Sequence, residues 1–141
     1  MINVLFVCIH NSARSQMAEA FLNHMGADVF RAESAGIEPG ALNPLVVKVM
    51  AEIGYDLASN SVASVFDYFK EGRCYDVVVK VCDQARGQKC PIFPSAKVTL
   101  NWSFSDPAEL TGAEEEKLAG LRQIRDQIQR KIAAFIEVFE T

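Results

Sequence analysis

The sequence predicts an α/β fold: a single domain over residues 1–141, with a four-stranded parallel sheet and helices on both faces. Two observations support this prediction. Short runs of β-branched and aromatic residues alternate with segments of helical periodicity, which is the pattern of strands joined by helical crossovers. A chain of 141 residues, 50% of them hydrophobic, also fits one domain of ordinary size with a sizeable core.

Four strands are predicted from short apolar runs. The first run, INVLFV, is almost continuous, as expected of a strand that is buried on both faces. The predicted strands are residues 2–7, 28–34, 75–83 and 96–104. Parallel sheets bind ligands beyond the carboxyl ends of their strands, and Cys8 lies at such an end.

Four helices are predicted from apolar residues at helical spacing and from their end signals. Asn43 followed by Pro44 is typical of a cap and a first helical residue. Thr111 and Glu114 form a capping-box pattern before the last helix. The helices are expected from near Ala13 to Gly26, from Pro44 to Gly54, from a Ser61 cap to Phe69, and from the capping box through Phe139.

Composition excludes several classes of function. The net charge of −4 and the absence of a basic run argue against nucleic acid as the main partner. No apolar stretch approaches the ~20 residues of a membrane helix, and the start, MINVLFVCIH, does not resemble a signal peptide. We therefore expect a cytoplasmic protein, where disulfides are usually transient and catalytic. The four cysteines form no CxxC pair, which disfavours structural zinc.

Residues 8–15 read CIHNSARS: a cysteine, five residues, an arginine and a hydroxyl. Because the loop joins a buried strand to a helix, its N–H groups can form an anion nest at the positive end of the helix dipole. The planar fork of Arg14 can grip two oxygens of a tetrahedral anion. These positive groups favour the thiolate of Cys8, which is the form that attacks. The loop therefore predicts an oxyanion site with Cys8 as nucleophile.

The remaining loop residues have supporting roles in this prediction. Ser15 is expected to donate a hydrogen bond to the sulfur, and Asn11 to tolerate a left-handed conformation that shapes the loop. The expected substrate-binding residues are Ile9, His10, Asn11, Ser12, Ala13 and Arg14. The alternative is that Cys8 is a buried small hydrophobe and Arg14 an exposed helix residue. The complete spacing disfavours it.

The loop CIHNSARSQMAEA resembles that of the low-molecular-weight tyrosine phosphatases and of the thioredoxin-linked arsenate reductases built on the same fold. The resemblance spans nearly the whole chain and includes AESAG at residues 32–36, the Asp106-Pro107 pair and the strand that carries Cys82. It implies a low-molecular-weight phosphatase-like fold. It also implies that Asp106 is the general acid, since a leaving oxygen on phosphorus or arsenic needs a proton.

The other cysteines favour reduction over hydrolysis, because arsenic can take two electrons from thiols. Cys82 is expected at the same sheet edge as Cys8, and Cys90 follows across the polar stretch DQARGQK, which can rearrange at low cost. The resemblance to arsenate reductases implies that Cys82 attacks Cys8 to release arsenite. It further implies that Cys90 then attacks Cys82, leaving a Cys82–Cys90 disulfide that thioredoxin reduces.

Three alternatives stay open. A tyrosine phosphatase would use the same loop, but Ala108 follows Asp106-Pro107 where similar phosphatases carry a tyrosine. In a reductase coupled to glutathione and glutaredoxin, Cys82 would react with a glutathione-bound intermediate. A phosphate-loop protein that only binds a partner would need no nucleophile. Cys82 and Cys90 have two further interpretations: packing residues, since free cysteine is often buried, or a disulfide relay by themselves, which would leave the loop unexplained.

The expected substrate is arsenate, with phosphate or sulfate as mimics, and the expected physiological role is arsenical resistance. No tightly bound cofactor is predicted. Some members of the resembled family bind potassium through an asparagine, a glutamate and a serine, and Asn11, Glu19 and Ser34 match those positions. Where a further acidic ligand is expected, this chain has Ser64.

Overall fold

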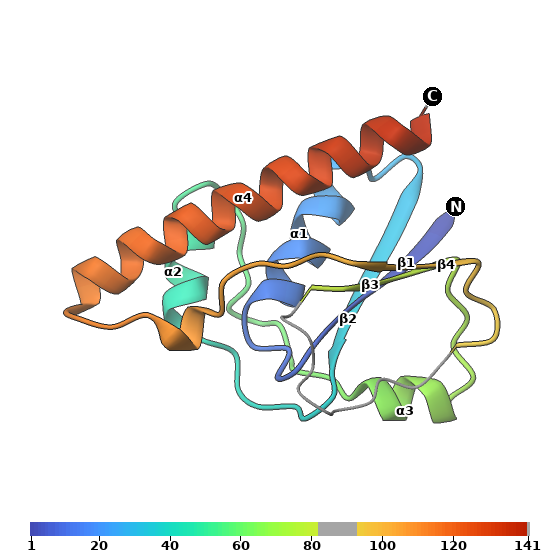
Figure 1. Cartoon of the computed structure of the whole chain (residues 1–141), viewed down its shortest axis with the longest axis horizontal. Helices are drawn as coiled ribbons and strands as arrows, with labels where there is room; N and C mark the ends of the chain where they lie inside the picture. The colour runs from blue at the N-terminus through green and yellow to red at the C-terminus, as the bar shows by residue number, and fades with distance from the viewer. Residues whose placement is uncertain (82–92, 141) are drawn as a thin grey trace.

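The computed structural model describes residues 1–81 and 93–140. Within these residues, four parallel strands form one sheet in the order β2-β1-β3-β4 (Figure 1). The strands are β1 (Ile2–Cys8), β2 (Phe30–Gly36), β3 (Val77–Lys80) and β4 (Val98–Asn101). The helices are α1 (Arg14–Met25), α2 (Pro44–Ala51), α3 (Val65–Lys70) and α4 (Glu114–Glu140), with a 3-10 turn, η1 (Pro107–Glu109).

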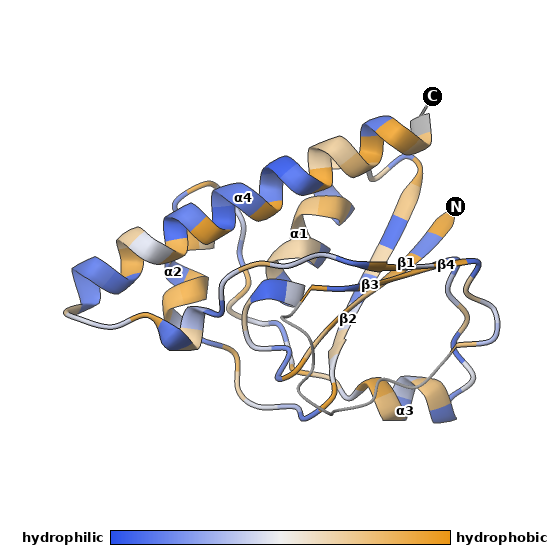
Figure 2. Ribbon diagram, in the orientation of Figure 1, coloured by the Kyte–Doolittle hydropathy of each residue, from blue (hydrophilic) through white to orange (hydrophobic). Residues whose placement is uncertain are grey.

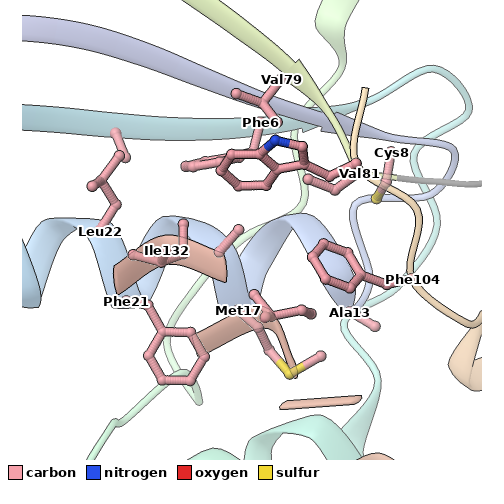
Figure 3. Close-up of a cluster of buried hydrophobic side chains, with 14 of the residues drawn as sticks. Phe6, Cys8, Ala13, Met17, Phe21, Leu22, Val79, Val81, Phe104 and Ile132 are labelled. Atoms are coloured by element: carbon pink, nitrogen blue, oxygen red, sulfur yellow. The ribbon is translucent and has the colours of Figure 1, made fainter. Parts of the chain in front are cut away.

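The alternating side chains of β1 separate two apolar layers. Val4, Phe6 and Cys8 contribute to the larger layer, which α1, α2 and α4 cover (Figures 1 and 3). Leu5 and Val7 contribute to a smaller layer beneath α3 on the opposite face. Strand β1 is apolar along most of its length, whereas apolar and polar residues alternate along α4 (Figure 2). The predicted sheet with helices on both faces is confirmed.

The strand order places the carboxyl end of β1 at a topological switch point. From β1 the chain passes to β2 on one side, and β3 pairs with β1 on the other side. Ligand sites of open α/β sheets form where the connections diverge in this way. Cys8 is the last residue of β1, so its thiol lies at the position where such a site is expected.

The second helix begins as predicted and the third does not. The Asn43 side chain accepts a hydrogen bond from the Leu45 N–H, with proline at the first helical position. The prediction that Ser61 caps α3 is wrong: the cap is Ser64, at the end of a segment held extended. The Ser61 carbonyl accepts from the Gln16 side-chain amide on α1, and the Ala63 N–H donates to the Asn11 side-chain oxygen in the cysteine loop. These bonds hold the segment before Ser64 against α1 and the loop.

The capping box predicted before α4 is also wrong. Helix α4 begins at Glu114, so Thr111 lies outside it. Gly112 has a φ of 100°, a conformation that a right-handed helix cannot contain. The carboxylate that turns back toward the start of the helix is that of Glu116, which accepts from the Ala113 N–H at 3.5 Å.

Strands β3 and β4 are shorter than predicted. Residues 82 and 83 of the third predicted strand lie outside the described residues, and β3 begins at Val77 rather than at residue 75. Strand β4 lies at the edge of the sheet, and most of its side chains are exposed. Little packing therefore supports a longer strand. In the described ranges 1–81 and 93–140, no helix has the length and apolar character to cross a membrane.

Gly36 allows the end of β2 to lie against the cysteine loop. A Cβ atom at this position would lie 2.8 Å from the Ile9 carbonyl oxygen and 2.9 Å from the Asn11 nitrogen. Both neighbours are backbone atoms, so the clash could be relieved only by moving the strand or the loop. A Cβ atom at Gly40 would lie 3.5 Å from its nearest neighbour, which is ordinary contact.

We predict that Gly36→Ala lowers the free energy of unfolding by about 1–3 kcal/mol, because an added methyl group is forced into packed backbone. Gly40→Ala is the matched control, since it adds the same group near the same loop without a clash. Urea unfolding followed by circular dichroism measures both. Equal stability of the two variants would contradict the role given to Gly36.

Candidate active site

The carbonyl groups of the cysteine loop are turned outward. They accept hydrogen bonds from the N–H groups of the segment that follows β2. The donor and acceptor pairs are Ile37 to Cys8 at 3.0 Å, Glu38 to Ile9 at 2.7 Å, Gly40 to His10 at 3.0 Å and Asn43 to Ser12 at 3.0 Å. With its carbonyls held this way, the loop keeps N–H groups for its inner side, as an anion nest requires.

Two donors are directed at the Cys8 sulfur. The Asn11 N–H donates to it at 3.1 Å, and the Ser15 hydroxyl lies 2.9 Å away. Because the Ser15 oxygen already accepts from the Asn11 side-chain amide at 2.7 Å, its single hydrogen is available for the sulfur. Hydrogen bonds to a sulfur anion favour the thiolate over the thiol. Cys8 is thus buried in the apolar layer, and its sulfur is also hydrogen-bonded by two polar groups that favour the nucleophilic thiolate.

Arg14 and Asp106 face each other next to the loop. One Arg14 nitrogen donates to the Phe104 carbonyl at 3.0 Å, and the other lies 3.7 Å from an Asp106 carboxylate oxygen. Asp106 caps η1 by accepting from the Ala108 N–H at 2.9 Å. Arg14 is buried, which rules out the exposed helix residue considered above, whereas Asp106 is 34% exposed. The guanidinium is therefore preoriented and the carboxyl remains accessible.

These groups surround one pocket above the sulfur. Its lining residues are Cys8, His10, Ser12, Ala13, Arg14, Asn43, Asp106, Pro107 and Ala108. Ile9 and Asn11, which are also predicted to bind substrate, are not among these lining residues; Asn11 is fully buried and its N–H donates to the Cys8 sulfur. Asn43 was predicted only as a helix cap, and the sequence carries no signal for its place in the pocket. Figure 3 shows Cys8 and Phe104 at the edge of the apolar layer.

Of the other three cysteines, the structure describes Cys74, which does not line this pocket. Cys82 and Cys90 lie outside the described residues, so their predicted roles stay predictions. Cys74 is exposed, and its thiol lies 3.6 Å from the Gly72 carbonyl oxygen. The last described residue before Cys82 is Val81, whose N–H donates to the Val7 carbonyl at 2.9 Å.

Glu19 and Ser34 lie behind the loop, at the position predicted to bind potassium. Burial raises the pKa of Glu19 to about 7, hydrogen bonds from Ser34 oppose this rise, and the charge of Glu33 adds to it. The Asn11 side-chain oxygen accepts from the Ala63 N–H, so its nitrogen is the atom that faces Ser34, at 3.0 Å. As arranged, the three predicted ligands do not offer three oxygens to one cation and do not fit a potassium site.

We predict that Glu19→Gln removes a pH dependence of stability. The pKa of Glu19 in the folded state is raised from 4.5 to about 7, so the folded chain holds this proton more tightly than the unfolded chain. The contribution of protonated Glu19 to the free energy of unfolding is therefore fully present below about pH 4.5, and it is lost as the pH rises through about 7. At pH 8 the variant should be more stable than the parent by on the order of 2 kcal/mol. Urea unfolding at pH 5 and pH 8 tests this, and an identical pH dependence in both proteins would contradict it.

The comparisons with known proteins agree with this geometry. The model of the low molecular weight phosphotyrosine protein phosphatase family matches residues 3–140. The arsenate reductase of Bacillus subtilis is 40% identical over 134 residues, which cover 95% of this chain and 94% of that relative.

Solved structures give the same result. An arsenate reductase in the phosphate binding state aligns with a TM-score of 0.78 at 26% identity, over 97% of this chain and 98% of that chain. An arsenate reductase from Archaeoglobus fulgidus aligns with a TM-score of 0.64 at 32% identity, over 92% of this chain and 98% of that chain. With a family match over nearly its whole length, this chain belongs to the low molecular weight phosphotyrosine protein phosphatase family.

Proposed function

We propose that this chain is an arsenate reductase that works in the cytoplasm and takes its electrons from thioredoxin. The observation that carries the proposal is the Cys8 sulfur, which accepts hydrogen bonds from two groups at the base of a pocket that Arg14 and Asp106 border. The curated relative from Bacillus subtilis, named as an arsenate reductase, supports the choice of substrate.

The first step is an attack on arsenic. Arsenate is a tetrahedral oxyanion, so its oxygens can be bound by the inner N–H groups of the loop and by the guanidinium of Arg14. The Cys8 thiolate forms a sulfur–arsenic bond. An arsenate hydroxyl group takes a proton from Asp106, its bond to arsenic breaks, and it leaves as water. Arsenic remains in the +5 state after this step.

The electrons move in the second step. The Cys82 thiolate attacks the Cys8 sulfur, the sulfur–arsenic bond breaks, and its electron pair stays on arsenic, which leaves as arsenite in the +3 state. Cys90 then attacks Cys82, which releases Cys8 as a thiolate and leaves a Cys82–Cys90 disulfide. A thioredoxin dithiol reduces this disulfide by exchange. One arsenate and two thiol electrons thus give one arsenite and one water.

Two features favour reduction over phosphate ester hydrolysis. Ala108 forms the pocket wall just beyond the general acid, so it offers no aromatic ring to stack on a phosphotyrosine. The second feature is the position of Val81, whose N–H donates to the Val7 carbonyl beside the end of β1. The proposed relay cysteine, Cys82, is the next residue in the sequence. Hydrolysis of small aryl phosphates by Cys8 and Asp106 remains the second candidate function, because it needs only the groups already in the pocket.

We predict that Cys82→Ser and Cys90→Ser each abolish repeated turnover with arsenate, thioredoxin, thioredoxin reductase and NADPH. Each variant lacks one thiol of the relay but keeps the oxyanion site, so phosphate should bind to it as to the parent. Cys74→Ser is the matched control and should keep full turnover, because Cys74 is exposed outside the pocket. Oxidation of NADPH is the readout.

Other results would lead to other conclusions. If the parent never reduces arsenate and all variants hydrolyse an aryl phosphate equally well, the chain is a phosphatase. If turnover requires glutathione and glutaredoxin and proceeds without thioredoxin, the electron donor proposed here is wrong.

We also predict that Arg14→Lys weakens phosphate binding by roughly 10- to 100-fold, because lysine keeps the charge but loses the planar fork and its bond to the Phe104 carbonyl. Arg31→Lys is the control, since Arg31 is an exposed residue of β2. Isothermal titration calorimetry with inorganic phosphate measures both. An unchanged affinity in Arg14→Lys would remove Arg14 from the binding site.

A further inference from the structure

We propose that Gln16 and Asn60 form the outer part of a one-way hydrogen-bond relay that ends on the Cys8 sulfur. Both act as positioning residues: neither lines the pocket, and each would change the reactivity of Cys8 through the groups between them. The inference rests on the proposed function only in taking Cys8 as the nucleophile.

Gln16 is the centre of this relay and is almost completely buried, at 1% exposure. Its side-chain nitrogen donates to the Asn11 side-chain oxygen at 3.3 Å and to the Ser61 carbonyl at 3.1 Å. Its side-chain oxygen accepts from the Asn60 amide at 3.2 Å. Both Gln16 hydrogens are used, so the amide has a single orientation that satisfies its neighbours.

The direction of the relay is set by a backbone group. The Ala63 N–H can only donate, and it donates to the Asn11 side-chain oxygen at 3.0 Å. The Asn11 nitrogen must therefore donate on its other side, to the Ser15 oxygen at 2.7 Å. The Ser15 hydrogen is then directed to the Cys8 sulfur at 2.9 Å. Every donor in the series points toward the sulfur: Asn60 to Gln16, Gln16 to Asn11, Asn11 to Ser15 and Ser15 to Cys8.

A series with one direction strengthens its last bond. In a buried environment each accepted hydrogen bond makes an amide or hydroxyl a better donor to the next group. Gln16 thereby strengthens the hydrogen bond that Ser15 donates to the Cys8 thiolate, and Asn60 strengthens that of Gln16. Without Gln16, the Asn11 oxygen would also lose one of its two donors inside the protein.

A purely structural role for Gln16 would give a different result. In that case Gln16 would only fasten the segment of residues 60–63 to α1, and its loss would lower stability without changing the thiol. Among the residues that the structure describes, the charged and titratable side chains that line the pocket with Cys8 are Arg14 on α1, Asp106 before η1 and His10 in the loop. All three are retained in the variants below, so a change in thiol reactivity would come from the relay.

The test is the rate at which iodoacetamide alkylates Cys8 as a function of pH. Trypsin cleavage after Arg14 leaves Cys8 as the only cysteine in the peptide of residues 1–14, so mass spectrometry can follow this thiol separately. The variants are Gln16→Met, which keeps the side-chain length without donors, and Asn60→Ala. The control is Asn23→Ala, because Asn23 is also an amide on α1 and bonds both backbone groups of Ala32, away from the loop.

We expect Gln16→Met to slow alkylation at pH 7 roughly fivefold, as for one weakened hydrogen bond, and to move its pH profile upward. Asn60→Ala should move it in the same direction by about twofold. Asn23→Ala should lower thermal stability and leave the profile unchanged. Gln16→Met or Asn60→Ala with the profile of the parent would overturn the proposal. Because the assay contains no arsenate, failure of the parent to reduce arsenate would refute the proposed function and leave this inference standing.

Discussion

The site depends on the buried carboxamide of Asn11. Its backbone takes a left-handed conformation, with a φ of 55°, and its side chain is fully buried. The side chain joins the cysteine loop to α1, to β2 and to the segment before α3, through bonds to Ser15, Gln16, Ser34 and Ala63. A buried amide is costly unless its donors and acceptors are all paired, so this complete pairing favours one loop conformation.

The sheet sets the position of Cys8 and of the backbone that bonds to the cysteine loop. The carboxyl end of β1 places Cys8 at the switch point, and Gly36 at the end of β2 lets the outer backbone come close enough to take the loop carbonyls. The apolar layer beneath α1 and α4 excludes water from one side of the sulfur. A thiolate there is stabilised by directed N–H and O–H groups rather than by bulk solvent, which keeps it available for attack.

Two charged side chains, Arg14 and Asp106, lie at the pocket. Arg14 is the buried cation at the pocket, held from behind by the Phe104 carbonyl, and Asp106 lies across from it with part of its carboxylate exposed. Such a pair can bind an oxyanion with one group and protonate its leaving oxygen with the other. The pocket shape and this pair suit phosphate and arsenate alike, because the two anions share shape and charge. The choice between hydrolysis and reduction therefore lies with further thiols.

Local signals in the sequence were enough for the fold class, for the position of Cys8 at the end of a strand and for Ser15 beside its sulfur, because strand patterning and loop spacing depend on residues close in the chain. They failed where distant residues decide. Ser61 looks like a helix cap, but its carbonyl is bonded to the Gln16 side chain and the cap is Ser64. The Asn11 side chain is fully buried and bonds to α1, β2 and Ala63, which no local pattern indicates. Asn43 in the pocket wall bonds to the Ser12 carbonyl, and Gln16 bonds to the Ser61 carbonyl 45 residues away in the chain; only tertiary packing brings such groups together.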